Sequence, residues 1–342
     1  MTPRRRSDGR RGCAAAAGAA LLLAVWPGAG AAAVPDSSAA SADSAAPADS
    51  AIHGPDAAPA LVREALVAAH GEERGEVLEP AGIAADAFGR VYVTDAALHR
   101  LQRLDADGTF LGVSGALGSR PGELRRPGAV ALLGALGVAV LDRENRRVAA
   151  YDLFGRFQGI LVDLAAAELE DEVGRVDPID LATDRGGALY VADADGERLL
   201  VFDFAGLYQR AIGGFGGNPG SFSGLAGVAV GPDGVIVTAE RGARRVQRLD
   251  AGGRPIGDWP LDVAHAGGGL AVAVDDSGRV AIADAGGDRI LWFAAPAAPP
   301  AAASVRAPRA LAFTTGGRLL VAADGEVARY AIARAGPAGR GE

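Results

Sequence analysis

The stretch that decides the fold is Ile83-Ala-Ala-Asp-Ala-Phe-Gly-Arg-Val-Tyr-Val-Thr-Asp95-Ala-Ala-Leu-His-Arg100-Leu-Gln-Arg-Leu-Asp105-Ala-Asp-Gly108. It is one copy of a unit that recurs towards the C-terminus. Its marks are an apolar residue, an acid twelve residues later, an Arg five after that and another acid five further on. The same marks stand at Val130, Asp142, Arg147 and Asp152, at Leu181, Asp193, Arg198 and Asp203, at Val228, Glu240, Arg245 and Asp250, and at Val272, Asp284 and Arg289. Units that begin 44 to 51 residues apart and keep the same internal spacing indicate a repeat architecture.

Each unit reads as a series of short strands joined by turns. Compact apolar runs rich in β-branched residues, such as Val91-Tyr-Val-Thr and Val235-Ile-Val-Thr, are typical of strands. Stretches such as Asp86-Ala-Phe-Gly89 and Asp105-Ala-Asp-Gly108 are turn signals, because Asp bonds the nearby backbone and Gly accepts positive φ. The unit is therefore predicted to be a four-stranded antiparallel meander. Radial repetition of such sheets predicts an all-β propeller.

Several of these stretches resemble NHL repeats. The similarity is carried by Leu189-Tyr-Val-Ala-Asp193, by Asp142-Arg-Glu-Asn-Arg-Arg-Val148 and by the Gly-rich loop Gly213-Gly-Phe-Gly-Gly-Asn-Pro-Gly-Ser-Phe222. It extends over about residues 61–335. The resemblance implies a six-bladed β-propeller. It implies no single activity, because such propellers serve as protein-binding platforms, RNA-binding domains and sensor ectodomains and, less often, as metal-dependent lyases or lactonases.

The N-terminus has the pattern of a secretory signal over residues 1–33. An Arg-rich start precedes an apolar run at residues 14–26, and Ala31-Ala-Ala33 offers a small-residue cleavage site. We therefore expect a secreted or periplasmic protein with no transmembrane span after cleavage, while an uncleaved anchor remains the alternative. Cleavage would remove five Arg, one Asp and Cys13, and would move the net charge from −8 to −12.

The remaining segments frame the repeats. Residues 34–60, rich in Ala, Ser, Asp and Pro, have little to bury and are predicted to be a disordered linker, and residues 336–342 a disordered tail. The sixth unit ends after its third strand, near Tyr330. Residues 61–69 are therefore predicted to supply the outer strand of the last blade and to close the ring, which would remove an exposed sheet edge. We expect a monomer.

A feature that recurs in every unit is expected to build the fold, so the repeated acid–Arg marks are interpreted as structural. Departures from the repeat are better site candidates. One is the insertion at residues 163–174, whose Ala, Leu and Glu content suggests a short acidic helix. We expect a partner to contact its acids, Glu168, Glu170, Asp171 and Glu172, on the face where propellers usually bind ligands, and a solvated loop is the alternative. Trp259, close to a loop, is a further candidate for a binding patch.

Three histidines, His70, His99 and His265, are predicted to lie in loops of that same face. Three imidazoles can hold a catalytic zinc. NHL-like amidating lyases use zinc bound by His, and gluconolactonase-type propellers hold a divalent cation, so the resemblance leaves a zinc or calcium site open. Ordinary surface histidines are the alternative, and no cofactor is expected.

The sequence thus favours a non-catalytic scaffold or sensor module of the cell envelope that binds a protein, peptide or glycan. The alternative is a metal-dependent lyase or lactonase with its site at the axial opening. The acidic net charge of the chain argues against nucleic acid as a partner.

Overall fold

The structure is a computed structural model of the chain, and it describes residues 60–263, 269–293 and 300–333. Contacts divide the chain into Met1–Ala51 and Ile52–Glu342, and every described residue lies in the second unit. The predicted signal, nearly all of the predicted linker, the predicted tail and His265 lie outside the described residues.

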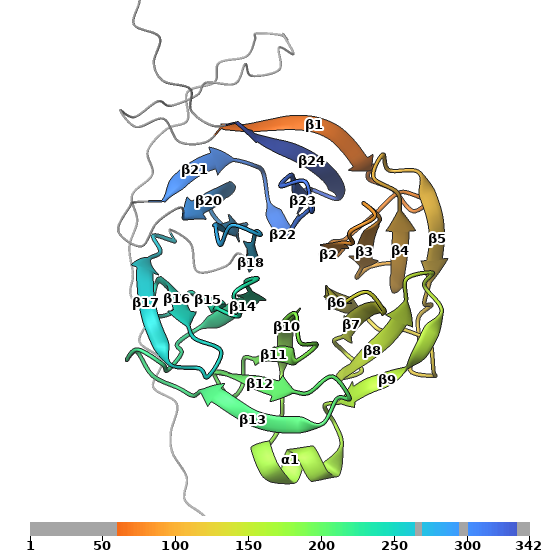
Figure 1. Ribbon diagram of the computed structural model, residues 1–342. Coiled ribbons are helices and arrows are strands. Elements are labelled where there is room, and N and C mark those ends of the chain that lie inside the picture. Colours follow the sequence, from red (N-terminus) through yellow and green to blue (C-terminus); the bar gives the residue numbers. More distant parts are fainter. Residues whose placement is uncertain (1–59, 264–268, 294–299, 334–342) are drawn as a thin grey trace, which may run out of the picture. The chain divides into compact units, whose positions relative to one another are not determined.

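The described residues form six four-stranded antiparallel sheets arranged as blades in a ring (Figure 1). Blades 1 to 3 consist of β2 (Pro80–Ala85), β3 (Val91–Asp95), β4 (Arg100–Leu104) and β5 (Phe110–Ser114); β6 (Pro127–Leu133), β7 (Gly137–Asp142), β8 (Arg147–Asp152) and β9 (Phe157–Asp163); and β10 (Pro178–Thr183), β11 (Leu189–Asp193), β12 (Arg198–Phe202) and β13 (Tyr208–Gly213). Blades 4 to 6 consist of β14 (Leu225–Val230), β15 (Ile236–Glu240), β16 (Arg245–Leu249) and β17 (Pro255–Pro260); β18 (Leu270–Val274), β19 (Val280–Asp284), β20 (Arg289–Phe293) and β21 (Ala301–Ser304); and β22 (Pro308–Phe313), β23 (Leu319–Ala323), β24 (Glu326–Ala333) and β1 (Ala60–Ala68). The all-β propeller predicted from the repeats is confirmed.

The core lies between neighbouring blades. The second strand of each blade is covered on both faces, so that every residue of β3 and β11 is buried. One apolar cluster joins Val67 and Leu320 of blade 6 to Ile83 and Val91 of blade 1. Because each blade presents apolar residues on both faces of its sheet, it needs two neighbours, and the ring supplies them.

The two faces of the ring carry different loops. The upper face, as we call it, carries the turns between second and third strands and the loops that connect blades. The lower face carries the other turns, such as Asp86–Arg90, where the Asp86 carboxylate accepts the N–H of Phe88 at 2.9 Å. Because successive strands of each blade run in opposite directions, successive turns lie alternately on the lower and the upper face.

The repeated acids and arginines meet on the upper face. Arg147 Nε donates to Asp142 Oδ2 at 2.7 Å, and Arg245 Nε donates to Glu240 Oε1 at 2.8 Å. The acids are buried and also accept backbone N–H groups from the preceding loop, as when Arg125 N donates to Asp142 Oδ1 at 2.7 Å. These contacts agree with a structural role for the repeated pairs.

β1 is the outermost strand of blade 6. It pairs antiparallel with β24, from Ala60 opposite Ala333 to Ala68 opposite Val327. The strand expected over residues 61–69 thus lies beside β24, the last strand that the structure describes, and Figure 1 shows the two together at the rim of the ring.

Candidate ligand-binding site

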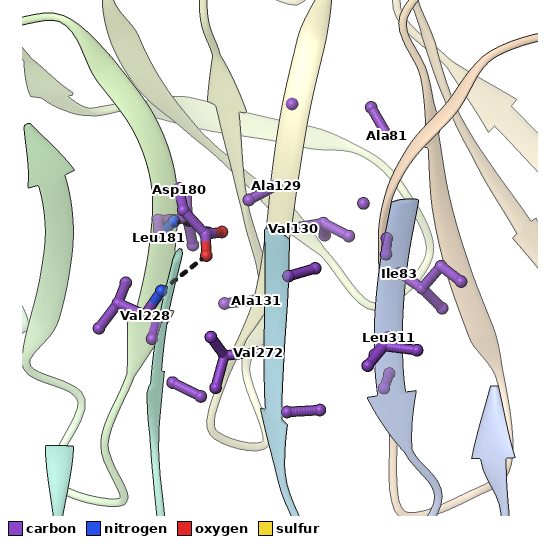
Figure 2. Close-up of a pocket in the computed structure, with 18 of the residues that line it drawn as sticks. Ala81, Ile83, Ala129, Val130, Ala131, Asp180, Leu181, Val228, Val272 and Leu311 are labelled. Carbon is purple, nitrogen blue, oxygen red and sulfur yellow. Dashed lines mark hydrogen bonds between the residues drawn. The ribbon is translucent and has the colours of Figure 1, made fainter. Parts of the chain in front are cut away.

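An axial cavity of about 380 Å³ lies where the first strands of all six blades face one another. Its lining comes from residues 81–83, 128–132, 179–183, 226, 228–230, 270–274 and 309–313. Most of these residues are Ala, Val, Leu, Ile or Gly. Figure 2 shows Asp180 as the acid among labelled residues that are otherwise apolar.

Asp180 lies in β10 and is partly exposed, since it faces the cavity. Its Oδ1 accepts the N–H of Leu181 and its Oδ2 the N–H of Val228, each at 2.9 Å. Burial among apolar groups raises the pKa of the Asp180 carboxyl to about 7, although the two N–H groups act in the opposite direction. The carboxylate and its acid form are therefore both populated near neutral pH.

The repeat marks Asp180 as an exception. The residue just before the apolar mark of each unit is Gly or Ala in five blades and Asp in the third, at Gly82, Ala129, Asp180, Gly227, Ala271 and Ala310. Sequence reasoning missed this residue, although the aligned units carried the signal. Its meaning needs the ring, because only there do the first strands of the six blades line a common cavity.

A second pocket, the arginine pocket, has a volume of about 410 Å³ and opens on the upper face over blades 1 to 3. Its charged lining residues are Glu79, Arg126, Arg143, Glu144, Arg146, Arg175 and Asp177. Ala81 and Gly128 line both this pocket and the axial cavity, so the two spaces adjoin.

Ion pairs hold three of the four guanidinium groups of the arginine pocket. Arg126 Nη2 donates to both carboxylate oxygens of Glu79 at 3.0 Å. Arg143 lies 3.9 Å from Asp177 and is half exposed.

The other two arginines of the pocket, Arg146 and Arg175, differ in their contacts. Arg146 is 2.5 Å from Glu170. Arg175 is exposed, and its guanidinium has no hydrogen bond or ion pair with the rest of the described chain. Guanidinium groups with free donors suit carboxylate or phosphate ligands.

The insertion borders the arginine pocket. It forms α1 (Ala167–Val173), so the short acidic helix predicted there is confirmed. Leu169 packs into the core, and Glu170 anchors the helix to Arg146. The other acids, Glu168, Asp171 and Glu172, are exposed. A partner contact at these acids stays a prediction.

The histidines give no metal cluster in the described part of the chain. His70 is exposed and follows β1, while His99 lies in the β3–β4 turn, where its Nδ1 accepts the N–H of Arg126 at 2.9 Å. No group of three or more His, Cys, Asp or Glu among the described residues could hold a metal ion. Because His265 is not among them, the predicted three-histidine site remains a prediction.

Trp259 lies near the end of β17, as its place next to a loop suggests, but its side chain is only 4 % exposed. It packs against Phe293 of blade 5, with 5.2 Å between ring centroids, and Arg248 lies over its ring at 5.1 Å. This burial speaks against the binding patch expected from the sequence. The indole instead fills the space between blades 4 and 5.

No helix among the described residues is long and apolar enough to cross a membrane.

No model of a known protein family matches the chain. The protein brain tumor of Drosophila melanogaster is 27 % identical over 145 residues, which is 42 % of this chain and 13 % of that protein. The chain therefore matches only a small part of that relative's length.

Solved structures are similar in fold at low identity. A gluconolactonase from Xanthomonas campestris has a TM-score of 0.57 and 13 % identity, with 76 % of this chain and 88 % of that chain covered. Regucalcin from Agrobacterium tumefaciens, described as a calcium-binding protein, has a TM-score of 0.56 and 18 % identity, with 78 % and 95 % covered. A virginiamycin B lyase from Staphylococcus aureus, inactive and solved with quinupristin, has a TM-score of 0.55 and 11 % identity, with 77 % and 98 % covered.

The period of the sequence, the four-stranded blades in a ring and these similarities point to one architecture. The chain is a six-bladed β-propeller, and part of its sequence is similar to the protein brain tumor.

Proposed function

We propose that this propeller is a non-catalytic binding module of the cell envelope that holds an acidic segment of a protein or peptide partner on its upper face. The observation that carries the proposal is the arginine pocket, where Arg143 and Arg175 present exposed guanidinium groups. The chain as a whole is acidic, with a net charge of −8, so the four Arg of this pocket distinguish its charge from that of the whole chain. Complementary charge of this kind orients a partner and speeds its encounter.

The geometry of the pocket also fits a partner of some size. It spans the upper ends of blades 1 to 3, and α1 stands beside it through the Arg146–Glu170 pair. The exposed acids of α1 would repel an acidic segment, and so would set the direction in which it lies across the pocket. Repeats build a rigid platform here, and the loops on it supply specificity.

The enzyme alternative, a metal-dependent lyase or lactonase, needs unlike polar side chains to converge at the axial opening. In the described lining of the cavity, the charged or hydroxyl-bearing side chains are Asp180, Thr183 and Arg309, and Thr183 is occupied as a donor to Leu132 O at 2.6 Å. This lining favours binding over hydrolysis or elimination. Elemental analysis of protein purified without chelator tests the alternative: stoichiometric zinc or calcium that is lost in His70→Ala or His265→Ala would support it.

Export is part of the proposal and rests on the signal pattern of residues 1–33. N-terminal sequencing of protein recovered from the envelope fraction tests it. We expect a mature chain that begins close to residue 34. A full-length chain in the membrane fraction would instead identify the segment as a retained anchor, and a cytoplasmic full-length chain would contradict export.

The direct test of the arginine pocket is fluorescence anisotropy with a Glu-rich peptide and its Gln-substituted twin. We expect the Glu peptide to bind and the Gln peptide to bind at least about tenfold more weakly, a difference of about 1.4 kcal/mol. The double variant R143E/R175E should lose the preference, and the effect should weaken with salt.

The matched control is Arg254→Glu, an exposed charge reversal in the lower-face turn before β17. It changes the net charge in the same direction and should leave binding unchanged. Equal binding of the two peptides, or equal losses in the pocket variant and the control, would refute the proposal.

A further inference from the structure

Asp180 breaks the symmetry of the six blades at the axis of the ring. Five blades place Gly or Ala at this position of their first strand, and blade 3 places a carboxylate there. A repeat that needed a carboxylate for its own fold would carry one in more than one blade. The exception therefore points to the cavity rather than to the blade.

The described residues around this carboxylate give it no cationic partner. No ion pair reaches Asp180 from the described residues. The other charged side chain in the cavity lining is Arg309, which is exposed and lies 3.8 Å from Glu79. The other labelled side chains of the cavity lining in Figure 2, such as Ala129, Val272 and Leu311, are apolar.

The hydrogen bonds of Asp180 are incomplete. A carboxylate has about four acceptor positions. Two of them are filled, by the N–H groups of Leu181 and Val228. The bond to Val228 ties blade 3 to blade 4, but it leaves acceptor capacity turned to the cavity.

We infer that the axial cavity binds a small molecule that carries a protonated primary amine on a short apolar body, with the ammonium group on Asp180. An ammonium group supplies three N–H donors and the charge that the carboxylate lacks. The Ala, Val and Leu side chains of the cavity pack against the apolar body, and the volume of about 380 Å³ limits its size. The inference does not depend on the acidic partner proposed for the arginine pocket.

Binding should depend on pH in a defined direction. The pKa of the Asp180 carboxyl is raised to about 7, so an ammonium ligand must displace a proton from it at lower pH. Arg309 is the other charged group among the described residues that line the cavity. Affinity should therefore fall about tenfold from pH 8 to pH 6, with proton release on binding.

Isothermal titration with n-pentylamine as the probe, and with 1-pentanol as a neutral molecule of the same shape, tests the inference. We expect the amine to bind at least about thirtyfold more tightly than the alcohol to the unchanged protein at pH 8, which corresponds to about 2 kcal/mol. The variant D180N should bind the two probes equally, whereas Asp258→Asn, an exposed carboxylate of β17, should behave as the unchanged protein.

The comparison of amine with alcohol, and of pH 8 with pH 6, needs no variant and so holds even if D180N folds poorly. Equal affinity for the two probes, no binding of the amine, or an amine affinity that is unchanged in folded D180N would each overturn the inference. Failure of these titrations would leave the peptide test of the arginine pocket untouched.

Discussion

The Asp side chains of this ring lie in two different environments. Asp142 and Asp193 are fully buried, yet each is paired with an Arg whose Nε lies 2.7 Å or 2.9 Å away. Asp180 faces a cavity and has backbone N–H donors but no cationic partner among the described residues. A paired carboxylate stabilises the fold in its charged form, whereas the charged form of Asp180 costs free energy because apolar groups surround it.

The first prediction at this scale concerns stability and pH. The pKa of Asp180 is raised to about 7 in the fold, from an ordinary value of 3.8, so the folded state binds the proton more tightly than the unfolded chain. This group therefore lowers the free energy of unfolding as the pH rises from about 4 to about 7. The loss is at most about 4 kcal/mol.

Asp180→Asn should remove that dependence. Urea unfolding at pH 4.5 and 7.5 measures it: relative to the unchanged protein, the variant should gain stability as the pH rises. Asp258→Asn, exposed on β17, is the control for loss of one carboxylate. A stability difference between D180N and the unchanged protein that stays constant with pH would contradict the raised pKa.

At the scale of the element, the acid–Arg pair joins a hairpin to the loop above it. Asp142 and Arg147 are opposite each other in the β7–β8 register, which explains their five-residue spacing in the sequence. Arg147 also donates to the carbonyl groups of Ser119 and Glu123, both at 2.8 Å. One side chain thus ties the loop between blades 1 and 2 to blade 2.

Arg147→Met should therefore destabilise the protein strongly. The change keeps the apolar stem, but it leaves the buried Asp142 carboxylate without its cationic partner and several carbonyl groups without a side-chain donor. The expected cost is about 3 kcal/mol in the free energy of unfolding. Denaturant titration measures this cost. Arg185→Met is the control, since Arg185 and its partner Asp276 are 72 % and 73 % exposed, and it should cost less than about 1 kcal/mol. Similar costs for the two variants would refute the structural role of the pair.

Much of each element could be predicted from the sequence, because turn residues and apolar runs act locally. The spacing of acids and arginines gave the hairpins, and the composition of residues 163–174 indicated α1. The packing of Trp259 could not be predicted, since its contact with Phe293 joins two blades. The turns also contain non-Gly residues with positive φ, such as Arg146 at 50° and Arg244 at 52°. No sequence pattern predicted these backbone conformations.

At the scale of the whole molecule, six repeats indicated six blades, but the meaning of Asp180 depends on the ring. First strands that are far apart in the sequence meet at one axis only after the ring forms, so the axial cavity has no local signature. The arginine pocket likewise combines side chains from three blades. Sites of this kind are read from the arrangement of repeats and not from one repeat.

A prediction for the whole molecule concerns β1. Its Val67 and Ala68 are buried in the cluster that joins blades 6 and 1, and without β1 the edge of β24 would be unpaired. A chain that begins at residue 70 should unfold at least about 10 °C lower than one that begins at residue 58, or should aggregate.

Thermal unfolding followed by circular dichroism measures this difference. The chain from residue 58 is the matched control, because it keeps β1 and lacks only residues outside the described part. A synthetic peptide of residues 58–70 should restore part of the lost stability to the shorter chain. Equal unfolding temperatures for the two chains would show that the ring does not rely on β1.

The pairing of β1 with β24 also decides how the ring responds to mechanical load. Ala60 lies opposite Ala333, so the two strands end side by side, and a pull on both ends of the propeller acts on the same end of one antiparallel ladder. The hydrogen bonds of that ladder would then break one after another, as in a zipper, rather than all together in shear. Tension applied through both ends would open blade 6 first and leave the interfaces among blades 2 to 5 unloaded.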